Sequence, residues 1–146
     1  MQELLVTEVI PREKGRTFIR FENGMEVLLY KGEVRKLSLQ EGTYIPREKY
    51  DEIIYEILGT RAKKRALFLL ERMDRTERQL RDKLTQNGYP KICVDLAVDY
   101  VKNYHYIDDM RYAVNFISCQ QNKKSRQKLK MDLLSKGIDK SMIEQA

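Results

Sequence analysis

The chain has 146 residues, of which 42% are hydrophobic and 34% charged, and its formal net charge is +6; this length suits one compact domain or two small ones. No run approaches the ~18 apolar residues of a membrane-spanning helix, and the early acidic residues do not fit a signal peptide, so we expect a cytoplasmic protein without a membrane partner. A single histidine, two cysteines and no tryptophan offer little for zinc or Ser-His-Asp chemistry, so we expect a binding protein that is not an enzyme and needs no metal or cofactor.

Short strands are predicted in the first part of the chain. Three segments have the β-branched residues or the alternation of apolar and polar side chains that strands favour: residues 4–10, 17–21 and 25–30. Between the second and third segments, Asn23-Gly24 is a strong hairpin signal, because both residues tolerate a positive φ. We therefore expect a small antiparallel sheet, which needs an apolar cover to be stable.

Two helices are predicted after these strands. Residues 31–39 can form a short helix, and Pro46 begins a second one whose apolar residues are spaced three and four apart. We expect Gly59-Thr60 to break or bend this second helix. The end of an N-terminal β-rich module, residues 1–59, is placed at that break.

The rest of the chain has helical patterns and contains a repeat. Four residues recur in the same order 49 positions later: Thr76, Leu80, Leu84 and Gly88 as Ser125, Leu129, Leu133 and Gly137. A repeat of this length indicates stacked helical units that share a core with their neighbours. We predict two three-helix units, residues 60–107 and 108–146, and the sequence leaves only about two turns for the last helix of the second. The predicted fold is thus mainly α, an elongated array of tandem three-helix repeats preceded by a small antiparallel β-rich α+β module.

Polar residues at the expected helix starts are interpreted as caps. Thr76, with Gln79 three residues later, has the pattern of a capping box, and Ser125 takes the equivalent place in the second unit. The adjacent carboxylates Asp108 and Asp109 could bind a divalent metal. They precede a helix, however, where carboxylates accept hydrogen bonds from free backbone N–H groups, and we favour this structural role.

The cysteines and the histidine are also given structural roles. Cys93 and Cys119 are expected to be reduced, buried thiols. His105 is expected to pack or cap at the end of a helix, since no second histidine accompanies it.

Positive charge is concentrated in the helical part. Residues 1–58 hold 9 basic and 11 acidic residues, whereas residues 59–146 hold 19 basic and 11 acidic residues. The candidate binding residues form a basic face around the two caps: Arg65, Arg72, Arg75, Arg78, Arg81, Lys83, Lys123, Lys124, Arg126, Lys128 and Lys130. Lys130 lies 49 residues after Arg81, so both units carry positive charge at the same place, and stacking could join the two patches into one surface.

Such a basic surface suits a phosphate backbone, although solvated helical faces would carry the same charges. Few aromatic residues are interleaved with these charges along the sequence. We therefore expect the stacking of bases to add little to any binding of nucleic acid.

Three segments resemble signatures of the RecX regulatory proteins. Residues 72–84, followed by Gly88, are similar to the first repeat of that family. Residues 106–113, with an aspartate pair and an aromatic-Ala step, resemble its second signature, and residues 133–138 resemble its Lys-Gly-Ile ending. The N-terminal module is similar to the extra module of RecX proteins from Gram-positive-type bacteria. Family members usually have three tandem units, and this sequence lacks the third.

The resemblance implies a regulator of the RecA recombinase. Such a protein lies in the helical groove of the RecA–DNA filament and restrains its ATPase, strand-exchange and coprotease activities, which modulates DNA repair, recombination and the SOS response. The implied partners are the RecA filament and single- and double-stranded DNA bound without sequence specificity, and we expect a monomer. Two other interpretations stay open: a nucleic-acid-binding helical protein that needs no RecA, and a helical-repeat adaptor whose charges only solvate its surface.

Overall fold

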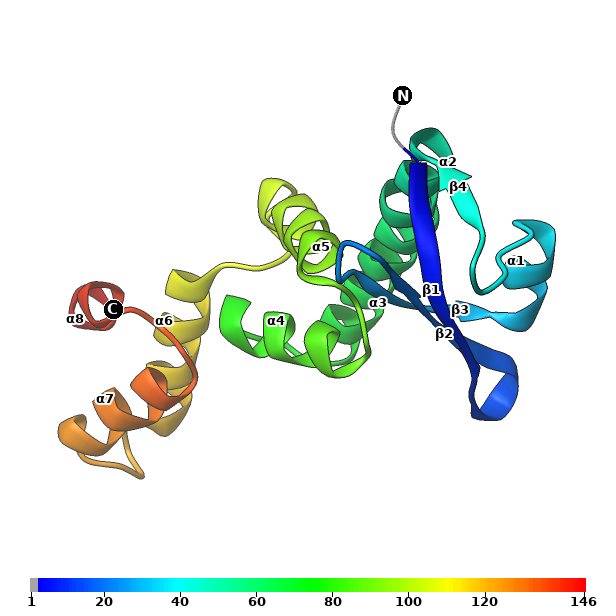
Figure 1. Cartoon of the computed structure of the whole chain (residues 1–146). Coiled ribbons are helices and arrows are strands. Elements are labelled where there is room, and N and C mark those ends of the chain that lie inside the picture. Colours follow the sequence, from blue (N-terminus) through cyan, green and yellow to red (C-terminus); the bar gives the residue numbers. More distant parts are fainter. Residues whose placement is uncertain (1–2) are drawn as a thin grey trace.

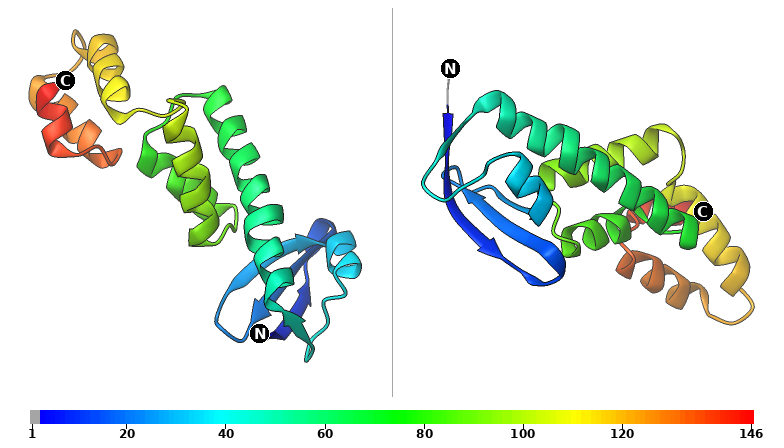
Figure 2. Two further views of the ribbon diagram at one scale, coloured as in Figure 1. Left: turned by 90° about the horizontal axis from the view of Figure 1, so that it is seen from above. Right: turned by 90° about the vertical axis from the view of Figure 1, so that its right-hand side faces the viewer.

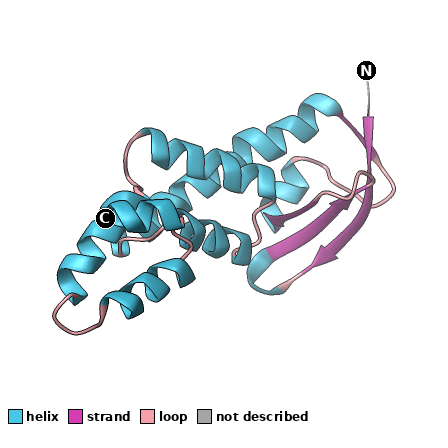
Figure 3. Ribbon diagram, turned by 90° about the vertical axis from the view of Figure 1, so that its left-hand side faces the viewer, coloured by secondary structure: helices cyan, strands magenta, loops and turns pink. Residues whose placement is uncertain are grey.

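The computed structural model describes residues 3–146, with a sheet at one end and helices filling the rest (Figures 1 and 3). The strands are β1 (Glu3–Pro11), β2 (Arg16–Phe21), β3 (Glu26–Tyr30) and β4 (Tyr44–Pro46), and the short helical turn η1 (Glu13–Gly15) joins the first two. All pairings are antiparallel, in the order β3-β2-β1-β4. The three predicted strands are confirmed. Tyr44-Ile45 is extended in sequence pattern but was not assigned to the predicted sheet, because three residues with a single buried side chain carry almost no alternation.

The hairpin between β2 and β3 follows the predicted turn. The Phe21 N–H donates to the Met25 carbonyl at 2.9 Å, and the Gly24 N–H donates to the Phe21 carbonyl at 3.0 Å. Gly24 has a φ of +87°, and the side-chain oxygen of Asn23 accepts from the Met25 N–H. Asn23 and Gly24 thus close the turn through different means, one with its side chain and the other with its backbone.

One long helix runs from the sheet into the first group of helices. It consists of α2 (Arg47–Asp51), the π-helical segment η2 (Glu52–Leu58) and α3 (Gly59–Arg72), and it follows the short helix α1 (Lys31–Lys36). The expected break at Gly59-Thr60 is wrong, since Gly59 is helical, with φ −60° and ψ −45°. A Cβ on Gly59 would lie 3.4 Å from Leu96 Cδ1, so this glycine marks close packing of two helices.

The sheet, the long helix and the rest of the first helical unit share one apolar core. The inward face of the sheet buries Val6, Ile19, Phe21, Val27 and Leu29. The long helix covers it with Ile53, Ile54 and Leu58, and the same core continues into α4 (Glu77–Gln86) and α5 (Lys91–Asn103). The N-terminal sheet is therefore stabilised by the long helix, as its small size requires.

The last three helices have a separate and smaller core. They are α6 (Asp109–Gln120), α7 (Arg126–Ser135) and α8 (Lys140–Gln145), and they bury Ala113, Leu133, Ile138 and Ile143. The view from above shows the sheet, the first three-helix group and the second following one another along one direction (Figure 2). The predicted fold class, an elongated array of three-helix repeats after a β-rich module, is confirmed. Within residues 3–146, no helix is both long and apolar enough to cross a membrane.

Candidate functional site

An exposed aromatic ring lies between two arginines on α3. Arg65, Phe68 and Arg72 are three and four residues apart, so they share one face of the helix. The guanidinium carbons of Arg65 and Arg72 lie 5.1 and 5.5 Å from the centre of the Phe68 ring, which is 43% exposed. Arg65 Nε also donates to the Asn87 side chain at 2.8 Å, and Lys83 lies one turn earlier on α4. Three residues of α3 make the first cation–aromatic cluster: Arg65, Phe68 and Arg72.

The second unit also has an aromatic ring between two cations, Phe116 of α6. Lys124 Nζ and Lys136 Nζ lie 5.4 and 5.5 Å from the centre of its ring. By the 49-residue offset Phe116 corresponds to Leu67 and Lys136 to Asn87, so the two arrangements are close in place but are not made by repeated residues. Aromatic rings therefore do lie among the basic residues, and the expectation of few interleaved aromatics is wrong. Sequence distance hid the contact between Phe116 and Lys136, whereas Phe68 lies within four residues of both of its arginines and was open to prediction.

Two lysines of the second unit share one carboxylate. Lys124 Nζ lies 2.6 Å from Asp132 Oδ2, and Lys128 Nζ lies 3.1 Å from Asp132 Oδ1. Hydrogen bonds from Lys124 and then from Lys128 lower the pKa of Asp132. Since one negative charge faces two positive ones, this part of the surface remains cationic.

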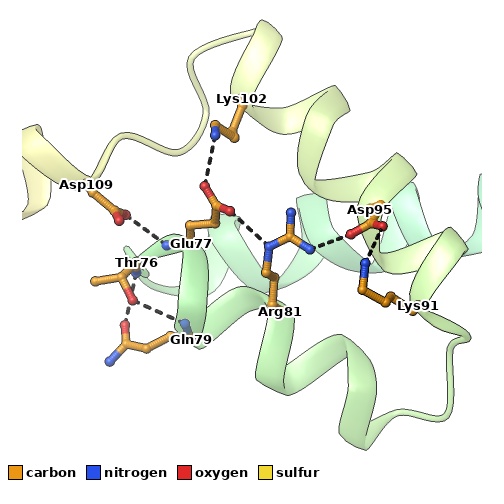
Figure 4. A network of polar contacts seen from close by, with 8 residues as sticks. All are labelled: Thr76, Glu77, Gln79, Arg81, Lys91, Asp95, Lys102 and Asp109. Carbon is orange, nitrogen blue, oxygen red and sulfur yellow. Dashed lines mark hydrogen bonds and ion pairs between the residues drawn. The ribbon is translucent and has the colours of Figure 1, made fainter. Parts of the chain in front are cut away.

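Arg81 and Lys130, by contrast, lie in ion pairs inside their units. Arg81 pairs with Asp95 at 2.6 Å and with Glu77 at 2.9 Å (Figure 4). Lys130 lies 3.7 Å from Glu144, which is 49 residues after Asp95. The hydrogen bond to Asp95 is the largest cause of the raised pKa of Arg81. The equivalence of the two positions thus extends to an ion pair between the second and third helices of each unit.

Arg75 and Arg78 lie where the two units meet. Arg75 Nε is 3.4 Å from the Leu69 carbonyl at the end of α3. The side chain of Arg78 covers Gly137, where an added Cβ would overlap it. Among residues 3–146, seven of the candidate binding residues have no carboxylate partner: Arg65, Arg72, Arg75, Arg78, Lys83, Lys123 and Arg126.

Thr76 joins the first unit to the second. Its buried hydroxyl oxygen accepts from the Gln79 N–H at 3.1 Å and donates to the Lys136 carbonyl at 2.7 Å. Gln79 returns a hydrogen bond from its side-chain oxygen to the Thr76 N–H at 3.0 Å, which completes the predicted capping box. The same threonine therefore caps α4 and binds the end of α7.

The aspartate pair has two different capping roles. Asp108 accepts from the Arg111 N–H at 3.1 Å and caps its own helix, α6, as predicted. Asp109 instead accepts from the Glu77 N–H at 2.8 Å, so it caps α4 in the first unit (Figure 4). Ser125 caps α7 through the Lys128 N–H, also as predicted. The second role of Asp109 was missed, because its partner lies 32 residues earlier.

Two carboxylates at this junction, Glu77 and Asp109, have pKa values that are shifted in opposite directions. Burial would raise the pKa of Glu77, but hydrogen bonds from Lys102 and Arg81 outweigh it, so the pKa is lowered. Burial raises the pKa of Asp109, and the hydrogen bond from the Glu77 N–H only partly offsets this effect. Asp109 is thus held at the junction at some electrostatic cost.

The remaining titratable candidates occupy separate places. Cys93 is buried and its thiol donates to the Ile54 carbonyl at 3.3 Å, and burial raises its pKa to about 11. Cys119 is exposed, so the expectation of two buried thiols is wrong for this residue. His105 follows α5 with a φ of +60°. In the part of the chain that the structure describes, no three such side chains or carboxylates gather as a set of metal ligands.

The helical units match known protein families. Residues 62–100 match the family described as "RecX, first three-helix domain", and residues 108–146 match "RecX, second three-helix domain". A "Regulatory protein RecX" from Caldanaerobacter subterraneus subsp. tengcongensis is 34% identical over 143 residues, which cover 97% of this chain and 73% of that protein. Another from Clostridium acetobutylicum is 27% identical and covers 99% of this chain and 69% of its own length.

Solved structures agree on the fold. A crystal structure of regulatory protein RecX has a TM-score of 0.62 and 22% identity, over 97% of this chain and 71% of its own. The structure of RecX from Lactobacillus salivarius has a TM-score of 0.60 and 24% identity, over 62% of this chain and 60% of its own. With both helical units matched and the relatives similar over nearly the whole length, the chain belongs to the RecX family of regulatory proteins.

Proposed function

We propose that this chain binds the RecA–DNA filament and inhibits the ATPase, strand-exchange and coprotease activities of RecA. The family assignment supports a regulatory role, and the observation that carries the proposal is the set of seven basic residues without carboxylate partners among residues 3–146. Unpaired cations on helical units suit a phosphate backbone or an acidic filament surface, and their affinity would fall with salt.

In this proposal, inhibition is steric and electrostatic. The first cation–aromatic cluster, around Phe68, and the similar group of cations around Phe116 would hold the helical units on the filament. The extended arrangement of the units would let them contact more than one RecA subunit. The proposal keeps the predicted division of the chain into three parts, residues 1–59, 60–107 and 108–146. The boundary between the first two parts lies within the continuous helix that crosses Gly59.

The test is the DNA-dependent ATPase of RecA on single-stranded DNA, titrated with this protein. The variant reverses three unpaired charges, as Arg72→Glu, Lys83→Glu and Arg126→Glu together. We expect inhibition by the variant to need at least about tenfold more protein, because about six units of charge are lost from the surface that faces the polyanion. The wild-type chain should inhibit well below one copy per RecA subunit.

A matched control reverses three exposed basic residues of α1 instead: Lys31→Glu, Arg35→Glu and Lys36→Glu. It has the same net charge as the variant, so equal losses in both would assign the effect to overall charge. Unchanged inhibition by the folded variant would remove the basic surface from the mechanism.

A nucleic-acid-binding function without RecA is the second candidate, and the same unpaired charges favour it. The two functions differ in where the protein binds. Equal affinity for naked and RecA-coated DNA, with no effect on the ATPase, would support this second function.

A further inference from the structure

Three tyrosines form a ladder of rings at the end of α5. The ring centres of Tyr100 and Tyr104 are 5.0 Å apart, and those of Tyr104 and Tyr106 are 6.0 Å apart with an angle of 24° between the planes. Tyr104 is 60% exposed and Tyr106 is 50% exposed, so a large part of each of these two neighbouring side chains is open to solvent. We call Tyr100, Tyr104 and Tyr106 the tyrosine ladder.

The backbone fixes the spacing of the outer two rings. The His105 N–H donates to the Lys102 carbonyl and the Tyr106 N–H to the Val101 carbonyl, the pair of bonds that ends a helix with a left-handed residue. That residue is His105, at a φ of +60°, whereas α4 and α7 end in the same way at glycines. The reversal at His105 places Tyr104 and Tyr106 on the same side, which a continued helix would not do.

A cation lies at each end of the ladder. Lys63 Nζ is 5.4 Å from the centre of the Tyr100 ring. At the other end, the guanidinium of Arg111 donates to the His105 and Tyr106 carbonyls at 3.1 and 3.3 Å. Neither cation pairs with a carboxylate anywhere in residues 3–146, so both keep a charge available to a phosphate. Tyr104 and Tyr106 belong to the segment between α5 and α6, which links the two helical units (Figure 1).

We infer that the tyrosine ladder is a binding site for single-stranded nucleic acid, in which unstacked bases stack on Tyr104 and Tyr106 while Lys63 and Arg111 contact the adjacent phosphates. Open aromatic faces between cations are the arrangement that binds single strands without regard to sequence, since every base has a flat face. Bases in a duplex are already stacked on one another and are closed to these rings. The site therefore favours single strands over duplexes, a preference that the basic surface alone does not give.

This inference adds a site to the proposed function and does not depend on RecA, so its test uses naked DNA. Fluorescence anisotropy measures how tightly the protein binds a 15-nucleotide oligo(dT) and an abasic strand of the same length. The abasic strand has the phosphates without the bases. We expect Tyr104→Ala with Tyr106→Ala to lose at least about tenfold in affinity for oligo(dT). Affinity for the abasic strand should stay within about twofold of the wild type.

Two control variants separate stacking from general effects. Tyr104→Phe with Tyr106→Phe retains the flat rings and should bind oligo(dT) as the wild type does. Tyr44→Ala with Tyr55→Ala removes two exposed tyrosines from the N-terminal part, 60% and 46% exposed, and should also leave binding unchanged. An unaltered thermal midpoint checks that each variant is folded.

Two results would overturn the inference. Equal losses for oligo(dT) and the abasic strand would show that the alanines disturb the cations and that no base is stacked. Wild-type affinity for oligo(dT), together with weaker binding to a RecA filament, would assign the ladder to a protein contact. The variant that combines Arg72→Glu, Lys83→Glu and Arg126→Glu should still bind oligo(dT) more tightly than the abasic strand. A failure of the proposed function can therefore be distinguished from a failure of the tyrosine ladder.

Discussion

Asp109 links the two helical units through a single hydrogen bond to the Glu77 N–H. A backbone N–H at the start of a helix has no partner within that helix, so a side chain from elsewhere can supply one. Here the partner comes from the next unit, so the Glu77 N–H gains its acceptor only when α6 is in place, whereas the capping box of Thr76 and Gln79 is local. One carboxylate thus connects the stability of the first unit to the position of the second.

Substitution of Asp109 should separate hydrogen bonding from charge. Asp109→Ala leaves the Glu77 N–H without an acceptor and should lower the free energy of unfolding by about 1 kcal/mol at pH 7. Asp109→Asn retains a side-chain oxygen as acceptor and should cost less than the alanine. Urea unfolding of the three proteins measures the difference, and an equal loss for both variants would contradict the capping role.

The pH dependence of the same variants follows from the raised pKa of Asp109. A carboxyl whose pKa is raised by folding contributes stability that is present below its unfolded pKa and is lost as the pH rises through its folded pKa. Asp109→Asn removes this loss, so its stability relative to the wild type should increase as the pH rises across that interval. The negative charge of Glu77 adds to the rise in the pKa of Asp109, and the asparagine also removes this repulsion, which changes the comparison in the same direction.

Among the elements, the long helix from Arg47 to Arg72 shows what the sequence could and could not predict. Its apolar stripe identified the helix, but Gly59 suggested a break that does not exist. The helix continues through this glycine because buried residues on both sides of it pack into the shared core, with Leu96 of another helix beside it. Local propensity gives the element, whereas the reason for an exception within it lies in packing that only the fold brings about.

The glycines at positions 59 and 88 should respond in opposite ways to alanine. Gly59 is helical and the nearest atoms to an added Cβ are at 3.4 Å, so Gly59→Ala should raise the free energy of unfolding by up to about 1 kcal/mol. Gly88 has a φ of +93°, so Gly88→Ala should lower it by about 1–2 kcal/mol. Thermal unfolding compares the two, and a loss of stability at Gly59 would show that the packing against Leu96 requires glycine.

The candidate site was predicted in part. Capping residues such as Thr76 and Ser125 were identifiable, because their bonds are made within four residues. The ion pairs of Arg81 and Lys130 were not, since Asp95 and Glu144 lie 14 residues further along. The exposed position of Cys119 also differed, because a helix with little buried surface has no strong apolar face to orient it.

On the scale of the whole molecule, the structure has a large core and a small one. The sheet and the first helical unit share the former, while the second unit buries few residues of its own. Unequal cores joined by a few hydrogen bonds favour unfolding in separate steps. We expect α6–α8 to open at lower free energy than the rest.

Leucines at equivalent places test this expectation. Leu84→Ala and Leu133→Ala each remove a fully buried side chain and should each cost about 2–5 kcal/mol. Hydrogen exchange should show that Leu133→Ala increases exchange only in α6–α8, whereas Leu84→Ala also exposes α3–α5 and the sheet. A single cooperative transition that both variants shift equally would contradict separate steps.

The uninterrupted helix from Arg47 to Arg72 also has a mechanical consequence. A helix that packs along both of its halves into one shared core cannot rotate at its middle, so the sheet and the first helical unit move as one piece. Rotation between the units is left to the short connection between α5 and α6. The hydrogen bonds that Thr76 and Asp109 make between the two units restrict this rotation. A partner that binds the sheet therefore also fixes the orientation of the first helical unit. Only the second unit can change its orientation relative to them.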